Sequence, residues 1–199
     1  DFDATATLSN KDGIVHLNEH DARALCDGLA HAPFTVSKVD EKAYTNRPKA
    51  PFMTSTLQQA AAGRLKWGAQ RTMRVAQALY ERGYITYMRT DSTTLSDTAI
   101  NAARTQAAQL YGADHVPDAP RRYDRKVKNA QEAHEAIRPA GDVFRTPAEV
   151  AGELVGDEFA LYDLIWKRTV ASQMADARGT TATIRLSGTS NDGRVAEFS

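Results

Sequence analysis

Arg47-Pro48-Lys49-Ala50-Pro51 divides the chain into two kinds of structure, because its two prolines predict a stiff connector. Before it, apolar and polar residues alternate as in half-buried strands, and after it apolar residues recur at helical intervals. The alternation returns beyond about residue 174. The simplest architecture is a mixed α and β fold in which a helical domain, residues 47–174, is inserted into a β-rich domain formed by residues 1–46 and 175–199.

The β-rich ends carry turn signals between their alternating runs. Residues 2–8 and 14–17 predict a hairpin, and Asn18 can cap a short helix before a strand at residues 34–39. Near the C-terminus, strands around 182–186 and 195–198 flank a turn containing Asn191-Asp192-Gly193.

The helical part begins near Ser55, where Ser55 and Gln58 have the spacing of a capping box. A second helix is expected from 69 to 82, closed by Gly83, with an apolar stripe formed by Met73, Ala76, Leu79 and Tyr80. Further helices are predicted at 96–111, 146–154 and 157–174. The core candidates of the last helix are Phe159, Leu161, Tyr162, Ile165 and Trp166.

Composition excludes several classes of protein. With 199 residues, 42% of them hydrophobic, the chain is too apolar and too mixed in charge to be disordered. No apolar run approaches the roughly 20 residues of a membrane span. Cys26 is the single cysteine, which excludes an internal disulfide and favours a cytoplasmic location. The chain lacks an initiating Met, so we expect it to be part of a longer protein.

The net charge is zero, but the basic residues are clustered. Between Lys42 and Arg89, Glu81 is the single acidic residue, and the basic residues are Lys42, Arg47, Lys49, Arg64, Lys66, Arg71, Arg74, Arg82 and Arg89. This clustering predicts an anion-facing region, although a solvated basic face would give the same pattern.

The run GYITYMRTDS, residues 83–92, carries the clearest chemical signal. As an extended strand it would project Ile85, Tyr87 and Arg89 in the same direction. A phenol, with a pKa of about 10, is a weak nucleophile at neutral pH, and a nearby cation favours the phenolate and neutralises phosphate oxygens. Tyr87 and Arg89 could therefore act together on a phosphate, or they could be a packed aromatic and a surface residue.

Three runs in this chain resemble successive signatures of bacterial type IA DNA topoisomerases, in the same order and at similar spacing. They are PFMTSTLQQAA at 51–61, GYITYMRTDS at 83–92 and AQEAHEAIRP at 130–139. The resemblance covers residues 47–175 strongly and the ends weakly. It implies the tyrosine-bearing helical domain of the family's toroid, inserted into a β-rich hinge that opens as a gate for strand passage.

The resemblance also implies roles for individual residues. Tyr87 would attack one strand of single-stranded DNA and become joined to the 5′ phosphate, and the released 3′ hydroxyl could later reseal the strand without ATP. Arg89 would position the scissile phosphate, and His134 would contact a phosphate. Asp91, Thr86 and Thr90 would contact DNA from the same motif as Tyr87.

Other polar residues have two interpretations each. Gln58, Gln59, Arg71 and Arg74 could contact DNA, but helix capping already explains Ser55 and Gln58. Arg138 could bind a second phosphate or pair with a neighbouring glutamate such as Glu135.

The remaining parts of such an active site are not found in this sequence. The family's metal-binding toprim domain supplies a catalytic glutamate and lysine and the carboxylates that hold Mg²⁺, but the chain has no Asp-x-Asp-x-Glu run. We therefore expect Mg²⁺ and the leaving-group acid to come from outside the chain, which alone should not relax negative supercoils. The expected partners are single-stranded DNA and the toprim and neighbouring domains, in the bacterial nucleoid.

Three other functions would account for parts of this sequence. Tyrosine recombinases also use tyrosine, histidine and arginine, but their tyrosine comes last, whereas Tyr87 precedes His134. A non-enzymatic module that binds single-stranded DNA would explain the basic segment without explaining the tyrosine motif. A purely structural helical domain would explain only the periodicities.

Overall fold

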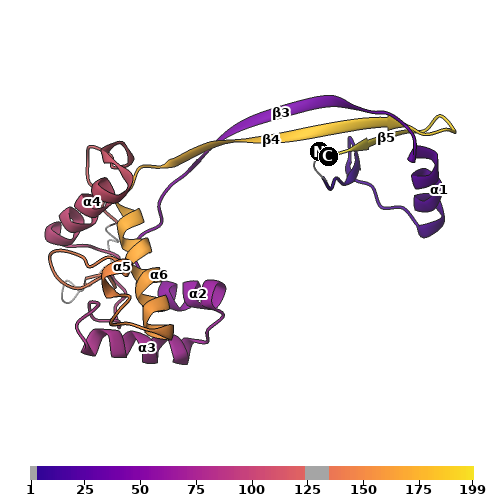
Figure 1. Cartoon of the computed structure of the whole chain (residues 1–199). Helices are drawn as coiled ribbons and strands as arrows, with labels where there is room; N and C mark the ends of the chain where they lie inside the picture. The colour runs from indigo at the N-terminus through magenta and orange to yellow at the C-terminus, as the bar shows by residue number, and fades with distance from the viewer. Residues whose placement is uncertain (1–3, 124–134) are drawn as a thin grey trace. The chain divides into compact units, whose positions relative to one another are not determined.

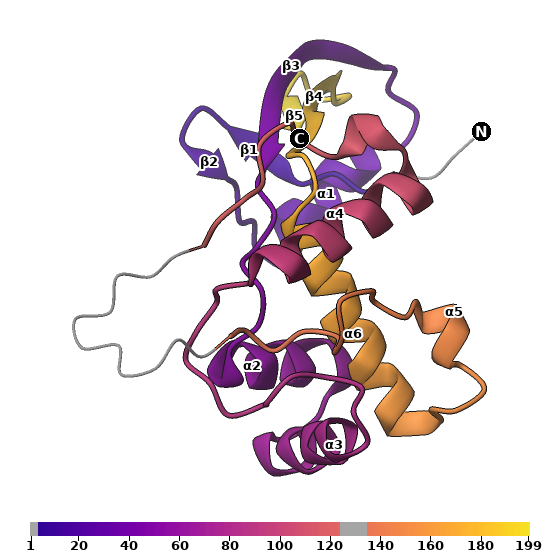
Figure 2. The same cartoon turned by 90° about the vertical axis from the view of Figure 1, so that its left-hand side faces the viewer.

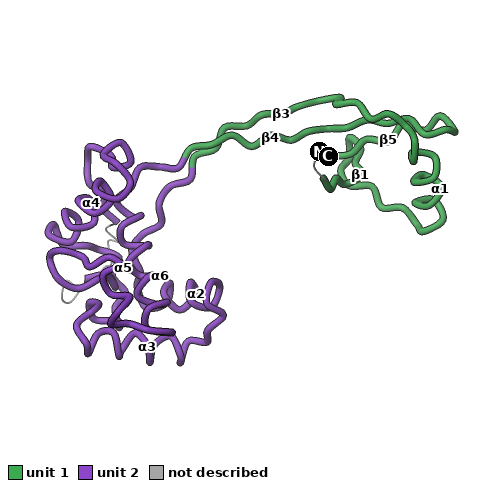
Figure 3. Tube along the Cα trace, viewed as in Figure 1, with its two compact units in different colours: residues 1–45, 178–199 green, residues 46–177 purple. Residues whose placement is uncertain are grey.

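The computed structural model describes residues 4–123 and 135–199 of the chain. It forms two compact units (Figure 3): residues 1–45 with 178–199 make unit 1, and residues 46–177 make unit 2. Unit 1 contains most of a five-stranded sheet and one helix, and unit 2 contains the other helices. The predicted mixed α and β fold class is therefore confirmed.

Unit 1 is built on a sheet with strand order β2-β1-β5-β4-β3, and these strands are labelled in Figure 2. Two antiparallel hairpins meet where β1 pairs with β5, at Leu8 opposite Phe198. Both hairpins were predicted, but the first is shorter than expected. The strands are β1 Leu8–Asn10, β2 Gly13–Ile14, β3 Phe34–Asn46, β4 Ala177–Thr189 and β5 Val195–Phe198.

Helix α1, Glu19–Leu29, begins as predicted at Asn18, whose side chain accepts a hydrogen bond of 2.9 Å from the Asp21 N–H. Within the sheet, the ring of Phe34 on β3 lies against Gly188 on β4 and forms an edge contact with Phe198 on β5. A Cβ at position 188 would come within 2.8 Å of the Phe34 ring, so this close approach requires glycine.

Unit 2 is organised around α6, Gly156–Ser172, which contacts α2, α3, α4 and α5 (Figures 1 and 2). The other elements are α2 Thr54–Leu65, α3 Ala69–Glu81, α4 Asp97–Tyr111, the short 3-10 helix Ala113–His115 and α5 Pro147–Val150. Helix α5 has four residues, shorter than predicted, because Gly152 follows closely and disfavours further turns. None of the helices that the structure describes has the length and apolar character of a membrane crossing.

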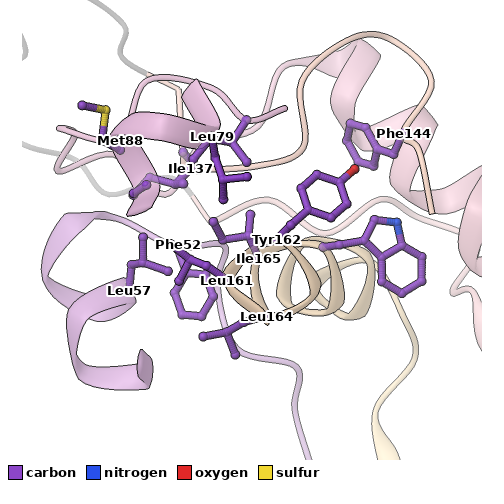
Figure 4. Packing of buried hydrophobic residues seen from close by; sticks show 14 of the residues in the cluster. Phe52, Leu57, Leu79, Met88, Ile137, Phe144, Leu161, Tyr162, Leu164 and Ile165 are labelled. Atoms are coloured by element: carbon purple, nitrogen blue, oxygen red, sulfur yellow. The ribbon is translucent and has the colours of Figure 1, made fainter. Parts of the chain in front are cut away.

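The core of unit 2 forms around α6 (Figure 4). Leu161, Tyr162, Ile165 and Trp166 are buried, as predicted, whereas Phe159 is only partly buried at the edge of the core. Apolar side chains from the other segments pack around them, among them Phe52, Leu57, Leu79, Ile137 and Phe144. The core thus joins the segments on either side of residues 83–92 to one helix.

Gln106 on α4 is a buried polar link between three segments. Its Oε1 accepts a hydrogen bond of 2.6 Å from Trp166 Nε1 on α6, and its Nε2 donates to the carbonyl oxygen of Phe144 at 2.5 Å. With 7% of its surface exposed, the residue is shielded from water that could replace these partners. Removing its amide would leave a buried indole N–H and a backbone carbonyl without partners.

We expect Gln106→Ala to lower the free energy of unfolding by about 2 kcal/mol, the cost of leaving buried polar groups unpaired. Chemical denaturation followed by circular dichroism measures this change. Gln109→Ala, on the exposed side of the same helix, should change stability by less than about 0.5 kcal/mol. Equal stability losses in the two variants would contradict a structural role for the Gln106 amide.

A second polar network lies at the start of residues 83–92. Glu153 accepts hydrogen bonds from Arg145 and from the Tyr84 hydroxyl, each with a shortest distance of 2.5 Å. The guanidinium groups of Arg82 and Arg145 lie over the Tyr84 ring, 5.2 and 5.7 Å from its centre. The hydrogen bonds from Arg145 and Tyr84 lower the pKa of Glu153 to about 2.

This lowered pKa predicts how stability depends on pH. Ionised Glu153 stabilises the fold above its ordinary pKa of 4.5, and the contribution is lost as the pH falls toward about 2. Glu153→Gln should therefore lower Tm at neutral pH, and its difference from the unmodified chain should shrink in acid. Thermal unfolding across this pH range tests the prediction, with exposed Asp142→Asn as the control. A Tm difference that is the same at every pH would contradict it.

Candidate active site around Tyr87

The segment from Tyr84 to Asp91 is an irregular loop, so the predicted strand is wrong. A single isolated bridge joins Ile85 to Pro139. Ile85 is 2% exposed and Tyr87 45% exposed, so the two side chains do not face the same way as predicted. The reason is packing: Ile85 and Met88 enter the core of unit 2, and among the described residues the pairing does not extend beyond the bridge to Pro139.

The first half of this segment is held by residues 136–140. The Thr86 N–H donates to the Arg138 carbonyl at 2.9 Å, and the Thr86 hydroxyl donates to the Ala136 carbonyl at 2.7 Å. The same hydroxyl accepts from the Arg138 N–H at 3.0 Å, and the Ala140 N–H donates to the Tyr84 carbonyl. The backbone immediately before Tyr87 is therefore fixed by hydrogen bonds rather than by a sheet.

The second half is held by Thr54 at the start of α2. The Thr54 N–H donates to the Thr90 carbonyl at 2.9 Å, and the Thr54 hydroxyl donates to the Met88 carbonyl at 2.8 Å. That hydroxyl also accepts a hydrogen bond of 2.9 Å from the Thr90 N–H. Thr54 and Thr86 together therefore hold the backbone on both sides of Tyr87, and we call these hydrogen bonds the threonine clamp.

Between the clamped positions, the side chains alternate between core and surface. Met88 and Thr90 are buried, whereas Tyr87, Arg89 and Asp91 are exposed. Within the described residues, the Tyr87 hydroxyl has no hydrogen-bond partner and the Arg89 guanidinium has no ion pair. The phenol and the guanidinium are thus both available to a ligand.

An open cavity of about 580 Å³ lies beside Arg89. It is lined by Met53, Thr54, Ser55, Gln58, Arg89, Thr90 and Asp91. The predicted capping box at Ser55 and Gln58 is wrong, because α2 begins at Thr54 and the Thr56 hydroxyl accepts from the Met53 N–H. Ser55 and Gln58 are therefore not needed for capping and can interact with a molecule in the cavity.

The other predicted residues have different surroundings. The Thr86 hydroxyl donates to the Ala136 carbonyl, and the Thr90 hydroxyl accepts from the Ser92 N–H at 3.0 Å, so both side chains hold the backbone. Arg71 forms an ion pair of 2.8 Å with Asp157 on α6. Arg74 and Gln59 are exposed, and Arg74 has no ion pair among the residues that the structure describes. His134 lies outside the described residues.

Arg138 has a structural role, which favours the second of its two interpretations. It is 8% exposed and donates to Glu135 at 2.8 Å and to the carbonyls of Pro139 and Gly141. Burial alone would raise the pKa of Glu135, but the hydrogen bonds from Arg138 and from the Ser96 N–H lower it overall. These interactions shape the 135–141 segment that holds Thr86.

Two features of the candidate site were not predicted from the sequence. The first is the hydrogen bonding of Thr54 to Met88 and Thr90, for which the sequence offers only a polar residue at the start of a predicted helix. The ring of Tyr80 contacts the ring of Tyr87 edge-to-face, with centroids 5.2 Å apart and an interplanar angle of 68°. A tight turn at Gly83 between the two tyrosines was the available signal, since it reverses the chain.

No group of three or more His, Cys, Asp or Glu side chains within 4–123 and 135–199 is arranged to hold a metal ion. Asp91 is the one carboxylate that lines the cavity beside Arg89.

The sequence and the fold can be compared with those of known proteins. The profile of a family described as DNA topoisomerase matches residues 3–197. DNA topoisomerase 1 of Mycolicibacterium smegmatis is 61% identical over 198 residues, and that of Streptomyces coelicolor is 60% identical over 199 residues. In both, the alignment covers 100% of this chain and 21% of the relative, so the chain spans about a fifth of their length.

A solved structure shows the same fold. The full-length topoisomerase I of Thermotoga maritima superposes with a TM-score of 0.74 and 33% sequence identity, over 100% of this chain and 32% of that protein. Because the profile match, the curated relatives and the structural match all span nearly the whole chain, the chain belongs to the bacterial type IA DNA topoisomerase family.

Proposed function

We propose that Tyr87 is the nucleophile that cleaves one DNA strand in a longer type IA topoisomerase. The observation that carries this proposal is the position of Tyr87. Its phenol is exposed on a backbone held from both sides, next to the buried Met88 and two residues before Arg89, which has no ion pair within the described residues. A phenol that is exposed, held by its backbone and without a hydrogen-bond partner in the described residues is what a reacting group requires.

The chemistry follows from these two side chains. The Tyr87 oxygen forms a bond to the phosphorus of the scissile phosphate as the bond to the 3′ oxygen breaks, and a proton passes to that oxygen. The product is a 5′-phosphotyrosine and a free 3′ hydroxyl. Because one phosphodiester replaces another, the reverse attack reseals the strand without ATP. The Arg89 guanidinium neutralises the charge that develops on the phosphate oxygens.

The cavity beside Arg89 gives the single-stranded DNA a binding surface. Ser55 and Gln58 offer hydroxyl and amide groups for phosphate or base contacts, and Arg74 adds an unpaired cation elsewhere on unit 2 among the described residues. His134 stays a predicted phosphate contact. We assign Arg71 and Arg138 to structural ion pairs first, because both guanidinium groups already hold carboxylates.

Mg²⁺ and the acid that protonates the leaving oxygen would come from outside this chain. Asp91 is a single carboxylate at the cavity, whereas a protein Mg²⁺ site is normally completed by a second carboxylate or by phosphates. No step is therefore assigned to a metal held by this chain. In the whole enzyme, the metal would support phosphate binding and strand cleavage.

Relaxation of negative supercoils is proposed for the longer protein only. The chain would supply the tyrosine unit and part of a β-rich hinge, and the toprim and neighbouring domains would supply the rest of the active site. We propose that the chain alone binds single-stranded DNA without relaxing supercoils.

Covalent capture in the full-length enzyme tests the proposal. Single-stranded DNA labelled on the 3′ side of the cleavage site is incubated with Mg²⁺, denatured, and separated on a protein gel. We expect labelled DNA to remain on the protein, to map to Tyr87 by mass spectrometry, and to be absent in Tyr87→Phe. Affinity for uncleaved DNA should change by less than about twofold, because only the hydroxyl is removed.

Matched variants sharpen this experiment. Tyr111→Phe removes the hydroxyl of another half-exposed tyrosine of unit 2 and should leave the adduct unchanged. Arg89→Ala should slow adduct formation by about 100-fold or more, as expected for loss of a charge-stabilising group. An adduct that persists in Tyr87→Phe would refute the assignment, and DNA binding without any adduct in the unmodified enzyme would favour a non-enzymatic binding module.

A further inference from the structure

Tyr80 lies on the last turn of α3 and is 42% exposed. The helical periodicity placed it in the apolar stripe of that helix, but the structure shows that this prediction is wrong. Leu79 beside it is fully buried, whereas Tyr80 is outside the core of unit 2. Its ring instead contacts the Tyr87 ring edge-to-face. Tyr80 therefore contacts the candidate nucleophile and does not pack in the core.

The turn that follows α3 brings the rings of Tyr80 and Tyr87 together. Gly83, with φ of +77°, ends α3 in a conformation that favours glycine. The Gly83 N–H donates to the Tyr80 carbonyl at 2.9 Å, and the Tyr84 N–H donates to the Leu79 carbonyl at 2.8 Å. These bonds turn the chain sharply, so a residue three positions before Gly83 meets a residue four positions after it.

The side chain of Tyr87 has little else to fix it within the described residues. The threonine clamp holds its backbone, but χ1 and χ2 of an exposed tyrosine can change among several rotamers unless a neighbour restricts them. Its hydroxyl has no hydrogen-bond partner in the described part of the chain. The edge-to-face contact with Tyr80 is thus the ring contact that can select one orientation of the phenol.

We propose that Tyr80 is a positioning residue for Tyr87, which holds the nucleophilic ring in the orientation from which it attacks the scissile phosphate. This inference rests on the proposed function of Tyr87 and adds a residue to it. An aromatic pair of this geometry shifts an equilibrium by about two- to tenfold. Losing the ring should therefore reduce the fraction of enzyme with a correctly oriented phenol, and the cleavage rate, by the same factor.

Single-turnover cleavage in the full-length enzyme tests the proposal. With DNA at saturating concentration, Tyr80→Ala should cleave about two- to tenfold more slowly, with an unchanged Kd for uncleaved DNA. Tyr80→Phe retains the ring and should restore the rate to within about twofold. A structural defect would instead lower Tm and would not be corrected selectively by the aromatic substitution.

The control is Tyr111→Ala, which removes a tyrosine ring of similar exposure at the end of α4 and should not change the rate. A wild-type cleavage rate in Tyr80→Ala would overturn the proposal, as would a Tyr80→Phe rate as low as that of Tyr80→Ala. A weaker Kd with an unchanged saturated rate would show that Tyr80 binds DNA and does not position Tyr87. Tyr87→Phe is measured in parallel. If the nucleophile assignment itself is wrong, the Tyr87→Phe enzyme still forms the covalent DNA adduct, whereas a failure of the Tyr80 proposal alone leaves that variant without an adduct.

Discussion

The hydrogen bonds of Thr54 and Thr86 are the interaction on which the candidate site depends. Backbone around Tyr87 lies beside the core without belonging to a helix or sheet, so its N–H and C=O groups need individual partners. Two threonine hydroxyls and the residues 136–140, which form an antiparallel bridge to this segment, supply several of these partners. This arrangement leaves the side chain of Tyr87 exposed while its backbone is held.

Elsewhere in unit 2, ion pairs between helices engage some of the clustered basic residues and leave others without a partner among the described residues. The first turn of α6 carries Asp157 and Glu158, which pair with Arg71 and Arg82 of the basic segment. Arg89, in contrast, meets no carboxylate within the part of the chain that the structure describes. The clustered basic residues therefore divide into cations that join helices and cations left for an anionic ligand, although the net charge is zero.

The sequence predicted the elements that depend on local or periodic signals. Asn18 caps α1 because its side chain meets a nearby N–H, and the apolar period of residues 157–174 identified α6 and most of its core. Contacts between distant segments carried no such signal: Thr54 meets Met88, and Tyr80 faces Tyr87 across a turn. Strand propensity misled at Tyr84 to Tyr87, because burial of Ile85 in the helical core decided the conformation. The family resemblance identified the candidate nucleophile, and the structure adds how that residue is held.

The most direct test of this account is hydrogen exchange and cleavage in Thr54→Val, which keeps the shape of the side chain and removes its hydroxyl. The Met88 carbonyl and the Thr90 N–H would lose their hydroxyl partner, so the Thr90 amide should exchange about five- to 100-fold faster, and the rate of DNA cleavage should fall. Thr105→Val, on the exposed face of α4, should change neither quantity. Unchanged protection and unchanged cleavage in Thr54→Val would contradict the claim that the threonine clamp presents Tyr87 to DNA.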